Sequence, residues 1–197
     1  MPFSAGRIRS FIAIELPLEV RNDLSMLKKE MDRDEHRFVR WVNVDGIHLT
    51  LKFLGDISFE QVAEITEVMA KSRRGISSFQ LELAGLGVFP DLKRSRIIWV
   101  GISGEVNQLL KLQRSLDLSL AHLGFAREMR PFTAHLTLAR VNQDISSVQL
   151  NSLGGLIKTT EFEGKSAFEV DSVNLMRSQL TGGGAVYSCL SSVALEG

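Results

Sequence analysis

The sequence lacks the paired cysteines of disulfide-bonded and metal-binding proteins and the long apolar runs of membrane proteins. It contains one cysteine, Cys189, so an internal disulfide and a paired-cysteine metal site are excluded. We expect this thiol to be buried as a small apolar side chain. No apolar run approaches the ~20 residues that cross a bilayer. We therefore expect a cytoplasmic protein without a membrane partner.

Net charge is also absent, because 23 Lys and Arg residues balance 23 Asp and Glu residues. A neutral chain creates no global field for coating long nucleic acids. A local basic cluster would still suffice to bind one phosphate at the end of a strand. With four prolines and no low-complexity linker, residues 1–197 are predicted to form a single domain. We expect it to be a monomer.

Hydrophobic periodicity predicts a mixture of strands and helices. The expected strands are 9–16, 38–44, 47–54, 79–89, 96–102, 135–141, 167–176 and 186–193. The expected helices are 18–31, one capped by Ser58 with Gln61 in a capping box, 105–123 ended by Gly124, and 148–157. Because hairpins occur beside crossovers, the predicted fold class is α+β.

One tetrapeptide occurs twice, as His48-Leu49-Thr50-Leu51 and as His135-Leu136-Thr137-Leu138. With four histidines and seven threonines in 197 residues, about 0.14 His-x-Thr matches are expected by chance. In each half of the chain, a strand and an amphipathic helix precede the motif, and a further helix and strand pair follow it. We therefore expect two copies of one unit, packed about a pseudo-two-fold axis with the motifs facing each other.

The spacing within each motif favours acid–base chemistry on phosphate. Side chains alternate along a strand, so His48 and Thr50 should project from one face, as should His135 and Thr137, while the leucines enter the core. Two imidazoles that titrate near neutral pH can act as an acid–base pair, and hydroxyls can hold phosphate oxygens. Metals usually take three or four protein ligands, and no such cluster accompanies the pair. His36 lies in a charged segment that we expect to be solvated.

The segments around these motifs resemble the RNA 2′,3′-cyclic phosphodiesterases, also called 2′-5′ RNA ligases, of the two-histidine (2H) phosphoesterase superfamily. The resemblance covers essentially the whole chain in order, through residues 11–14, 47–55, 86–90, 98–101 and 130–140. It implies a duplicated α+β unit of two interleaved lobes, with antiparallel sheets lining a central cleft. It also implies hydrolysis of the 2′,3′-cyclic phosphate at RNA ends to a 2′-phosphate, without a metal or nucleotide cofactor.

Carried onto this sequence, the resemblance makes His48 the acid that protonates the departing O3′ and His135 the base that activates water. Thr50 and Thr137 would bind the phosphate oxygens. Where relatives often have a proline before the second motif, this chain has Ala134, which should alter local stiffness without changing the chemistry.

Other residues are candidates for holding the RNA. Arg140 would reach the phosphate, but strict alternation points it away from His135, so this role requires a kink near Ala139. Phe53 and Phe132 could each stack on a base. Phe53 has the parity of the leucines, which favours a place in the core for this ring. The basic loop 93–96, together with Arg127 and Arg130, would contact the RNA backbone or form a merely solvated surface.

Three alternatives share these residues. Ligation of a cyclic end to a 5′-hydroxyl is the reverse transesterification and is expected only as a side activity. The same histidines could act on 2′-5′-linked oligonucleotides or small cyclic nucleotides. A non-catalytic RNA-end binding module is the third alternative, although binding alone needs no general acid.

Overall fold

The computed structural model describes residues 6–32, 38–182 and 184–196. His36, expected in a solvated segment, lies outside these residues. In chain order the elements are β1 (Ile8–Glu15), α1 (Leu18–Met31), β2 (Val39–Trp41), the 3₁₀ turn η1 (Val44–Gly46), β3 (His48–Ile57), α2 (Gln61–Ser72), β4 (Phe79–Phe89), β5 (Ile97–Gly104), α3 (Val106–Ala121), β6 (His135–Val141), α4 (Ser147–Thr159), β7 (Glu163–Val170), β8 (Ser172–Thr181) and β9 (Gly184–Ala194).

The strands form two antiparallel sheets, whose orders are β3-β1-β8-β9 and β2-β6-β5-β4-β7. Without β2, the second sheet repeats the first, because β6-β5-β4-β7 corresponds position by position to β3-β1-β8-β9. The motif strands β3 and β6 are therefore equivalent. The predicted α+β class and the duplicated unit are confirmed.

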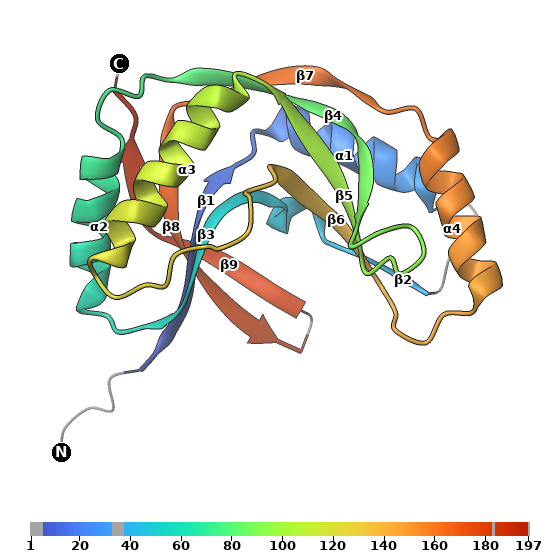
Figure 1. Cartoon of the computed structure of the whole chain (residues 1–197), viewed down its shortest axis with the longest axis horizontal. Helices are drawn as coiled ribbons and strands as arrows, with labels where there is room; N and C mark the ends of the chain where they lie inside the picture. Colours follow the sequence, from blue (N-terminus) through green and yellow to red (C-terminus); the bar gives the residue numbers. More distant parts are fainter. Residues whose placement is uncertain (1–5, 33–37, 183, 197) are drawn as a thin grey trace.

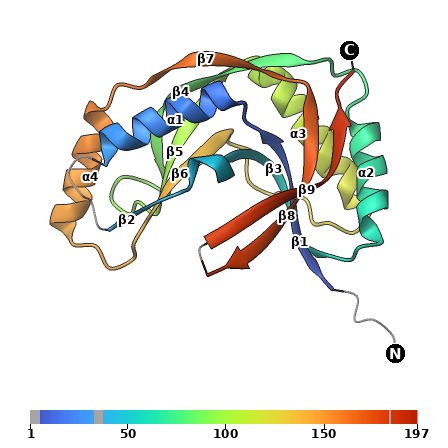
Figure 2. The same cartoon turned by 180° about the vertical axis from the view of Figure 1, so that it is seen from behind.

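The helices interleave the two halves of the chain. α1 follows β1 of the smaller sheet yet contacts β7 of the larger one, and α3 follows β5 of the larger sheet yet contacts β3 and α2. Figures 1 and 2 show the result as an arch, with α2 and α3 at one end and α1 and α4 towards the other. Each sheet is thus covered partly by a helix from the opposite half.

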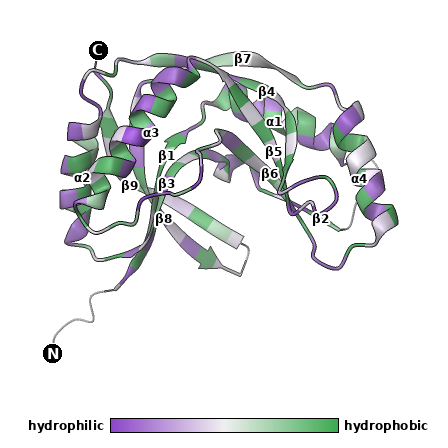
Figure 3. Cartoon of the chain, viewed as in Figure 1, coloured by the Kyte–Doolittle hydropathy of each residue, from purple (hydrophilic) through white to green (hydrophobic). Residues whose placement is uncertain are grey.

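The motif leucines anchor both strands in the main core. Leu49, Leu51, Leu136 and Leu138 are all buried in one hydrophobic cluster that spans both halves of the chain. Figure 3 shows hydrophobic and hydrophilic residues interspersed along the strands and helices, as expected for elements with one buried face. A second, smaller cluster consists of Phe11, Ala13 and Met176, with Tyr187 packed against it.

Two expectations about the C-terminal segment are wrong. The single strand expected at 167–176 is two strands divided at Asp171, since Val170 pairs with Phe79 of the larger sheet and Ser172 pairs with Ala194 of the smaller. Cys189 is exposed and not buried, because it lies on β9, one of the two edge strands of the smaller sheet. An apolar run of sequence does not reveal which strand will lie at an edge.

The expected caps are present at the helix termini. Before α2, the Ser58 N–H donates to Oε1 of Gln61 at 2.9 Å and the Gln61 N–H donates to Oγ of Ser58 at 3.4 Å, which is the predicted capping box. After α3, Gly124 has a φ of +89°, a conformation that favours glycine and ends the helix.

Candidate active site

The two histidines begin equivalent strands where the sheets meet. β3 and β6 contact each other, and both lie near the middle of the arch in Figure 1. His48 pairs with Glu15 of β1, and His135 pairs with Gly101 of β5. Both imidazoles are half-buried. The fold therefore brings together, on contacting strands, two motifs that are 87 positions apart in the sequence.

Both rings are held by the same hydrogen bond. Nδ1 of His48 donates to the carbonyl oxygen of Gly46 at 2.8 Å, and Nδ1 of His135 donates to that of Thr133 at 2.7 Å. A carbonyl oxygen only accepts, so the partner assigns the proton of each neutral ring to Nδ1. Nε2 is then the nitrogen that can take up or deliver a proton in each copy.

Aromatic rings surround each imidazole. The Phe11 ring stacks on His48 with centroids 4.5 Å apart, and the Tyr187 ring packs edge-on against His48 with centroids 4.9 Å apart. This burial lowers the pKa of His48 below its ordinary value, although the Gly46 carbonyl and the charge of Glu15 act in the opposite direction. The ring centroids of Phe89 and Trp99 lie 5.0 Å and 6.3 Å from the ring centroid of His135.

A β-bulge follows each threonine at the same position of the motif. In the first copy, Ala13 pairs with Thr50 and Ile12 pairs with Lys52, which leaves Leu51 as the extra residue. In the second copy, Trp99 pairs with Thr137 and Ile98 pairs with Ala139, which leaves Leu138 as the extra residue. Such an insertion reverses the alternation of side chains beyond it. The residues that directly follow each bulge therefore have the opposite parity to the one the sequence predicts. In β3 this holds for Lys52 and Phe53, after which a second register shift occurs opposite Ser10 and Phe11.

The reversal corrects the expectation for Phe53. This ring is 72% exposed and pairs with Phe11, whose ring centroid is 6.1 Å away. Because Phe11 stacks on His48, Phe53 lies on the histidine face of the sheet. The expectation that Phe53 enters the core was wrong, since it assumed strict alternation.

Arg140 is the equivalent of Phe53 in the second motif. It pairs with Ile97, while Thr137 pairs with Trp99 two residues further along β5. Directly paired residues share a face, so Arg140 is on the face of His135 and Thr137, and its side chain is exposed. The kink that its proposed role requires is present, with Leu138 and not Ala139 as the extra residue. Phe132 is half-buried against the main core, and its contact with a base remains a prediction.

Sequence reasoning missed the role of Lys52, which the first bulge places in the core. Only 7% of its side chain is exposed, and Nζ lies 2.5 Å from Oδ1 of Asp117 in α3 and 2.5 Å from the carbonyl oxygen of Ala126. Asp117 also accepts from the N–H of Glu128 at 3.1 Å. The pair thereby ties β3 of the first half to the segment that leads into His135. In the sequence, strict alternation places Lys52 on the same face as His48 and Thr50, so nothing there predicted that it would be buried.

Burial alone would raise the pKa of Asp117, but the hydrogen bonds from Lys52 and from the Glu128 N–H hold that pKa below its usual value. The carboxylate is thus ionised inside the fold at neutral pH. This buried charge depends on its partners, since an unpaired carboxylate at the same place would be costly.

Several of the basic residues expected to contact RNA have protein partners. Arg94 forms an ion pair with Asp91 at 2.9 Å, and Arg127 lies 3.5 Å from Asp117. Arg96 donates to the carbonyl oxygen of Asn142 at 3.3 Å, and Ser95 is buried. The contact of this loop with an RNA backbone remains a prediction.

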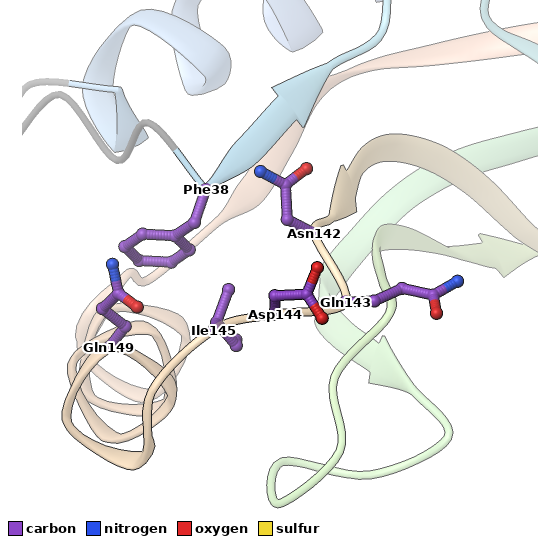
Figure 4. A pocket seen from close by; sticks show the side chains of 6 residues that line it. All are labelled: Phe38, Asn142, Gln143, Asp144, Ile145 and Gln149. Carbon is purple, nitrogen blue, oxygen red and sulfur yellow. The ribbon is translucent and has the colours of Figure 1, made fainter.

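A surface hollow lies beyond Arg140, where β6 ends and α4 begins. Figure 4 shows its lining side chains, which are Phe38, Asn142, Gln143, Asp144, Ile145 and Gln149. These residues include neither histidine motif.

Within residues 6–32, 38–182 and 184–196, no group of three or more His, Cys, Asp or Glu side chains is placed to hold a metal ion. Among the same residues, no helix is long and apolar enough to cross a membrane.

Comparison with known proteins finds the same duplication. The family described as LigT like Phosphoesterase matches twice, over residues 14–99 and 100–187. The RNA 2′,3′-cyclic phosphodiesterase of Methanothermobacter thermautotrophicus is 31% identical over 182 residues, covering 92% of this chain and 96% of that protein. The protein of the same name from Aquifex aeolicus is 30% identical over 191 residues, covering 96% and 98%. The crystal structure of E. coli LigT complexed with 3′-AMP matches with a TM-score of 0.76 and 27% identity over 96% of this chain and 99% of that one.

Proposed function

Because this chain belongs to the family of LigT-like phosphoesterases, we propose that it is an RNA 2′,3′-cyclic phosphodiesterase that uses His48 and His135 as its acid–base pair. The observation that carries the proposal is the matched state of the two rings, each with Nδ1 bonded to a carbonyl oxygen two residues upstream. This leaves two Nε2 atoms on contacting strands, which supports proton transfer from the attacking oxygen and to the leaving oxygen of one phosphate.

In the proposed reaction, His135 accepts a proton from water through Nε2 as the water oxygen attacks phosphorus. The bond between phosphorus and the ribose O3′ breaks, and Nε2 of protonated His48 delivers a proton to O3′. The product is a 2′-phosphate with a free 3′-hydroxyl, and one proton has passed from His135 to solvent and one from solvent to His48. The hydroxyls of Thr50 and Thr137 donate to non-bridging oxygens, where negative charge increases in the transition state.

The lowered pKa of His48 bears on this assignment. A general acid must carry its proton at the start of the reaction, and burial disfavours the charged imidazole. The negative charge of the bound cyclic phosphate and the nearby Glu15 both favour the protonated ring. We therefore propose that His48 becomes fully competent as an acid only when substrate is bound.

The exposed ring of Phe53 supports binding of a nucleotide in place of a phosphate alone. A flat ring on the histidine face can stack on a base of any identity, and Phe132 is a second candidate for that contact. The same attack on phosphorus by a ribose 5′-hydroxyl in place of water, with O3′ again as the leaving group, would give 2′-5′ ligation. Hydrolysis is favoured in dilute water, so ligation would remain a side activity.

The proposal extends to the protein as a whole. Residues 1–197 would act as one domain of two interleaved lobes and as a monomer in the cytoplasm, with the ends of RNA as the partner and without a metal or nucleotide cofactor. The interleaving of α1 and α3 between the sheets supports a single folding unit, because neither half covers its own sheet alone.

The test uses end-labelled RNA that carries a 2′,3′-cyclic phosphate, incubated with the protein in EDTA. We expect a 2′-phosphate product, and we expect His48→Ala and His135→Ala to reduce kcat by about 10²–10⁴-fold. A 3′-phosphate product would refute the assignment of O3′ as the leaving group. A cyclic end that survives wild-type protein, or turnover that EDTA abolishes, would refute the metal-free RNA-end activity.

A further inference from the structure

Tyr187 lies on the part of the β8–β9 hairpin that extends beyond the rest of the smaller sheet. It pairs with Ser178 of β8, whereas the pairing of β1 with β8 runs from Asn174 to Arg177. Figures 1 and 2 show this end of the hairpin reaching beneath the middle of the arch. A two-stranded ribbon is only marginally stable by itself, so the position of Tyr187 depends on what its side chain packs against.

The Tyr187 ring contacts three parts of the first motif site at once. It packs edge-on against the imidazole of His48, with centroids 4.9 Å apart, and edge-on against the Phe11 ring, with centroids 5.4 Å apart. It also lies against Gly46, because a Cβ built at that glycine would be 3.3 Å from Cε2 of Tyr187. Gly46 supplies the carbonyl oxygen that accepts from Nδ1 of His48. Tyr187 thus touches the imidazole, the ring stacked on it and the residue that binds its Nδ1.

These contacts determine how the imidazole is oriented. A histidine ring rotates broadly about the bond that joins it to Cβ, so one hydrogen bond does not by itself fix the direction of Nε2. Phe11 covers a face of the imidazole at an interplanar angle of 24°, and Tyr187 stands against it at 79°. An acid or base on a rigid strand needs this kind of packing around its ring to transfer a proton in one direction.

The second imidazole is enclosed differently. Phe89 and Trp99 both meet the His135 ring edge-on, at interplanar angles of 87° and 63°, and the residue that accepts from its Nδ1 is Thr133. The two motif copies therefore share their hydrogen bond but differ in the rings that surround each imidazole.

Four elements place other titratable groups around His48. Glu15 of β1 pairs with His48, and its charge favours the protonated ring. Cys189 of β9 is neutral near pH 7, because burial and the charge of Glu15 raise the pKa of its thiol. β6 contributes His135, and η1 contributes the exposed Asp45. Burial outweighs Glu15, and the pKa of His48 is lowered.

We propose that Tyr187 is a positioning residue for His48, which fixes the direction of Nε2 and excludes water from the imidazole. The inference rests on the proposed function, in which Nε2 of His48 delivers a proton to O3′. An imidazole kept dry in the free protein gains its proton together with the phosphate of the substrate. Because the ring of Tyr187 makes the contacts with His48, Phe11 and Gly46, phenylalanine should replace it without loss.

The test combines the titration of His48, followed by NMR and identified by its loss in His48→Gln, with turnover of RNA that ends in a 2′,3′-cyclic phosphate. Tyr187→Ala should raise the titration midpoint of His48 towards the ordinary value of 6.5, because water reaches the ring. The break in the pH profile of kcat/KM that belongs to His48 should move upward by the same amount. The maximum kcat should fall by about 2–10-fold, as loss of an aromatic contact predicts. Tyr187→Phe should restore all three quantities to wild-type values.

The matched control is Val186→Ala, which changes the neighbouring, 52% exposed residue of β9 and should alter neither titration nor turnover. Tyr187→Leu, which keeps an apolar side chain without the flat ring, replaces Tyr187→Ala if that variant does not fold. A fall in kcat/KM by one factor at every pH, with an unchanged titration of His48, would overturn the proposal while the proposed function stands. If wild-type protein leaves the cyclic phosphate intact, the proposed function has failed, and an unchanged midpoint in Tyr187→Ala would separately overturn the role of this ring.

Discussion

Replacement of Lys52 by methionine tests how the two halves of the chain are held together. The substitution keeps an unbranched side chain that is one heavy atom shorter, but it removes the charge that faces Asp117 and the donor to the carbonyl oxygen of Ala126. Asp117 would retain the N–H of Glu128 at 3.1 Å and the exposed Arg127 at 3.5 Å. A carboxylate that is 8% exposed would therefore lose its main partner without gaining access to water.

Loss of one partner from a buried ion pair costs about 3–5 kcal/mol. Because Arg127 and the Glu128 N–H remain, we expect the lower end, about 3 kcal/mol. For a chain of this size, that corresponds to a fall in Tm of roughly 6–12 °C. The free energy of unfolding is to be measured by urea denaturation at pH 7. kcat/KM on cyclic-phosphate RNA should also fall, since the pair fixes the segment that leads to His135.

Two further variants make the test decisive. Lys52→Met with Asp117→Leu removes both charges and should be more stable than Lys52→Met alone, because a buried pair can often be replaced by apolar residues at little cost. Lys71→Met removes the exposed partner of Glu67, at 4.0 Å, and should change stability by less than about 0.5 kcal/mol. A double variant that is less stable than Lys52→Met would refute the buried-charge argument.

Three other perturbations have defined outcomes. Gly87→Ala would place Cβ 2.1 Å from Cζ2 of Trp99, so the indole beside His135 must move. As a result, kcat/KM should fall and tryptophan fluorescence should change. Gly155→Ala, with open space around the new Cβ, should change neither kcat/KM nor fluorescence. Phe53→Ala should alter the free energy of unfolding by no more than about 0.5 kcal/mol. It should raise KM for RNA through loss of ~1–3 kcal/mol of stacking. A large loss of stability would contradict the exposed position of this ring. The folded-state pKa of His48 lies below 6.5, so near that pH the folded protein binds fewer protons than the unfolded one. Wild type should therefore lose stability relative to His48→Gln as the pH falls from 6.5 to the lower, folded-state pKa. Equal pH dependence of the two proteins would contradict the burial of this ring.

The sequence was informative wherever the signal is local or repeated. The helix at 18–31 and the strand at 135–141 have the predicted bounds, since periodic apolar residues and a proline at the helix start act within a few residues. The two copies of His-Leu-Thr-Leu predicted the duplication, which the paired sheets and the two family matches confirm. The division of acid and base between the two histidines stays a prediction, because both rings make the same hydrogen bond through Nδ1.

What the sequence by itself determined is therefore the set of chemical groups and the duplicated frame that carries them. Tertiary structure decided which side chains join that set, because a bulge depends on pairing with a distant strand. The extra residues Leu51 and Leu138 are defined only by β1 and β5. They turn Phe53 and Arg140 to the histidine face and bury Lys52 against α3. The packing of Tyr187 against His48 has the same origin, since no local pattern links two residues that are 139 positions apart.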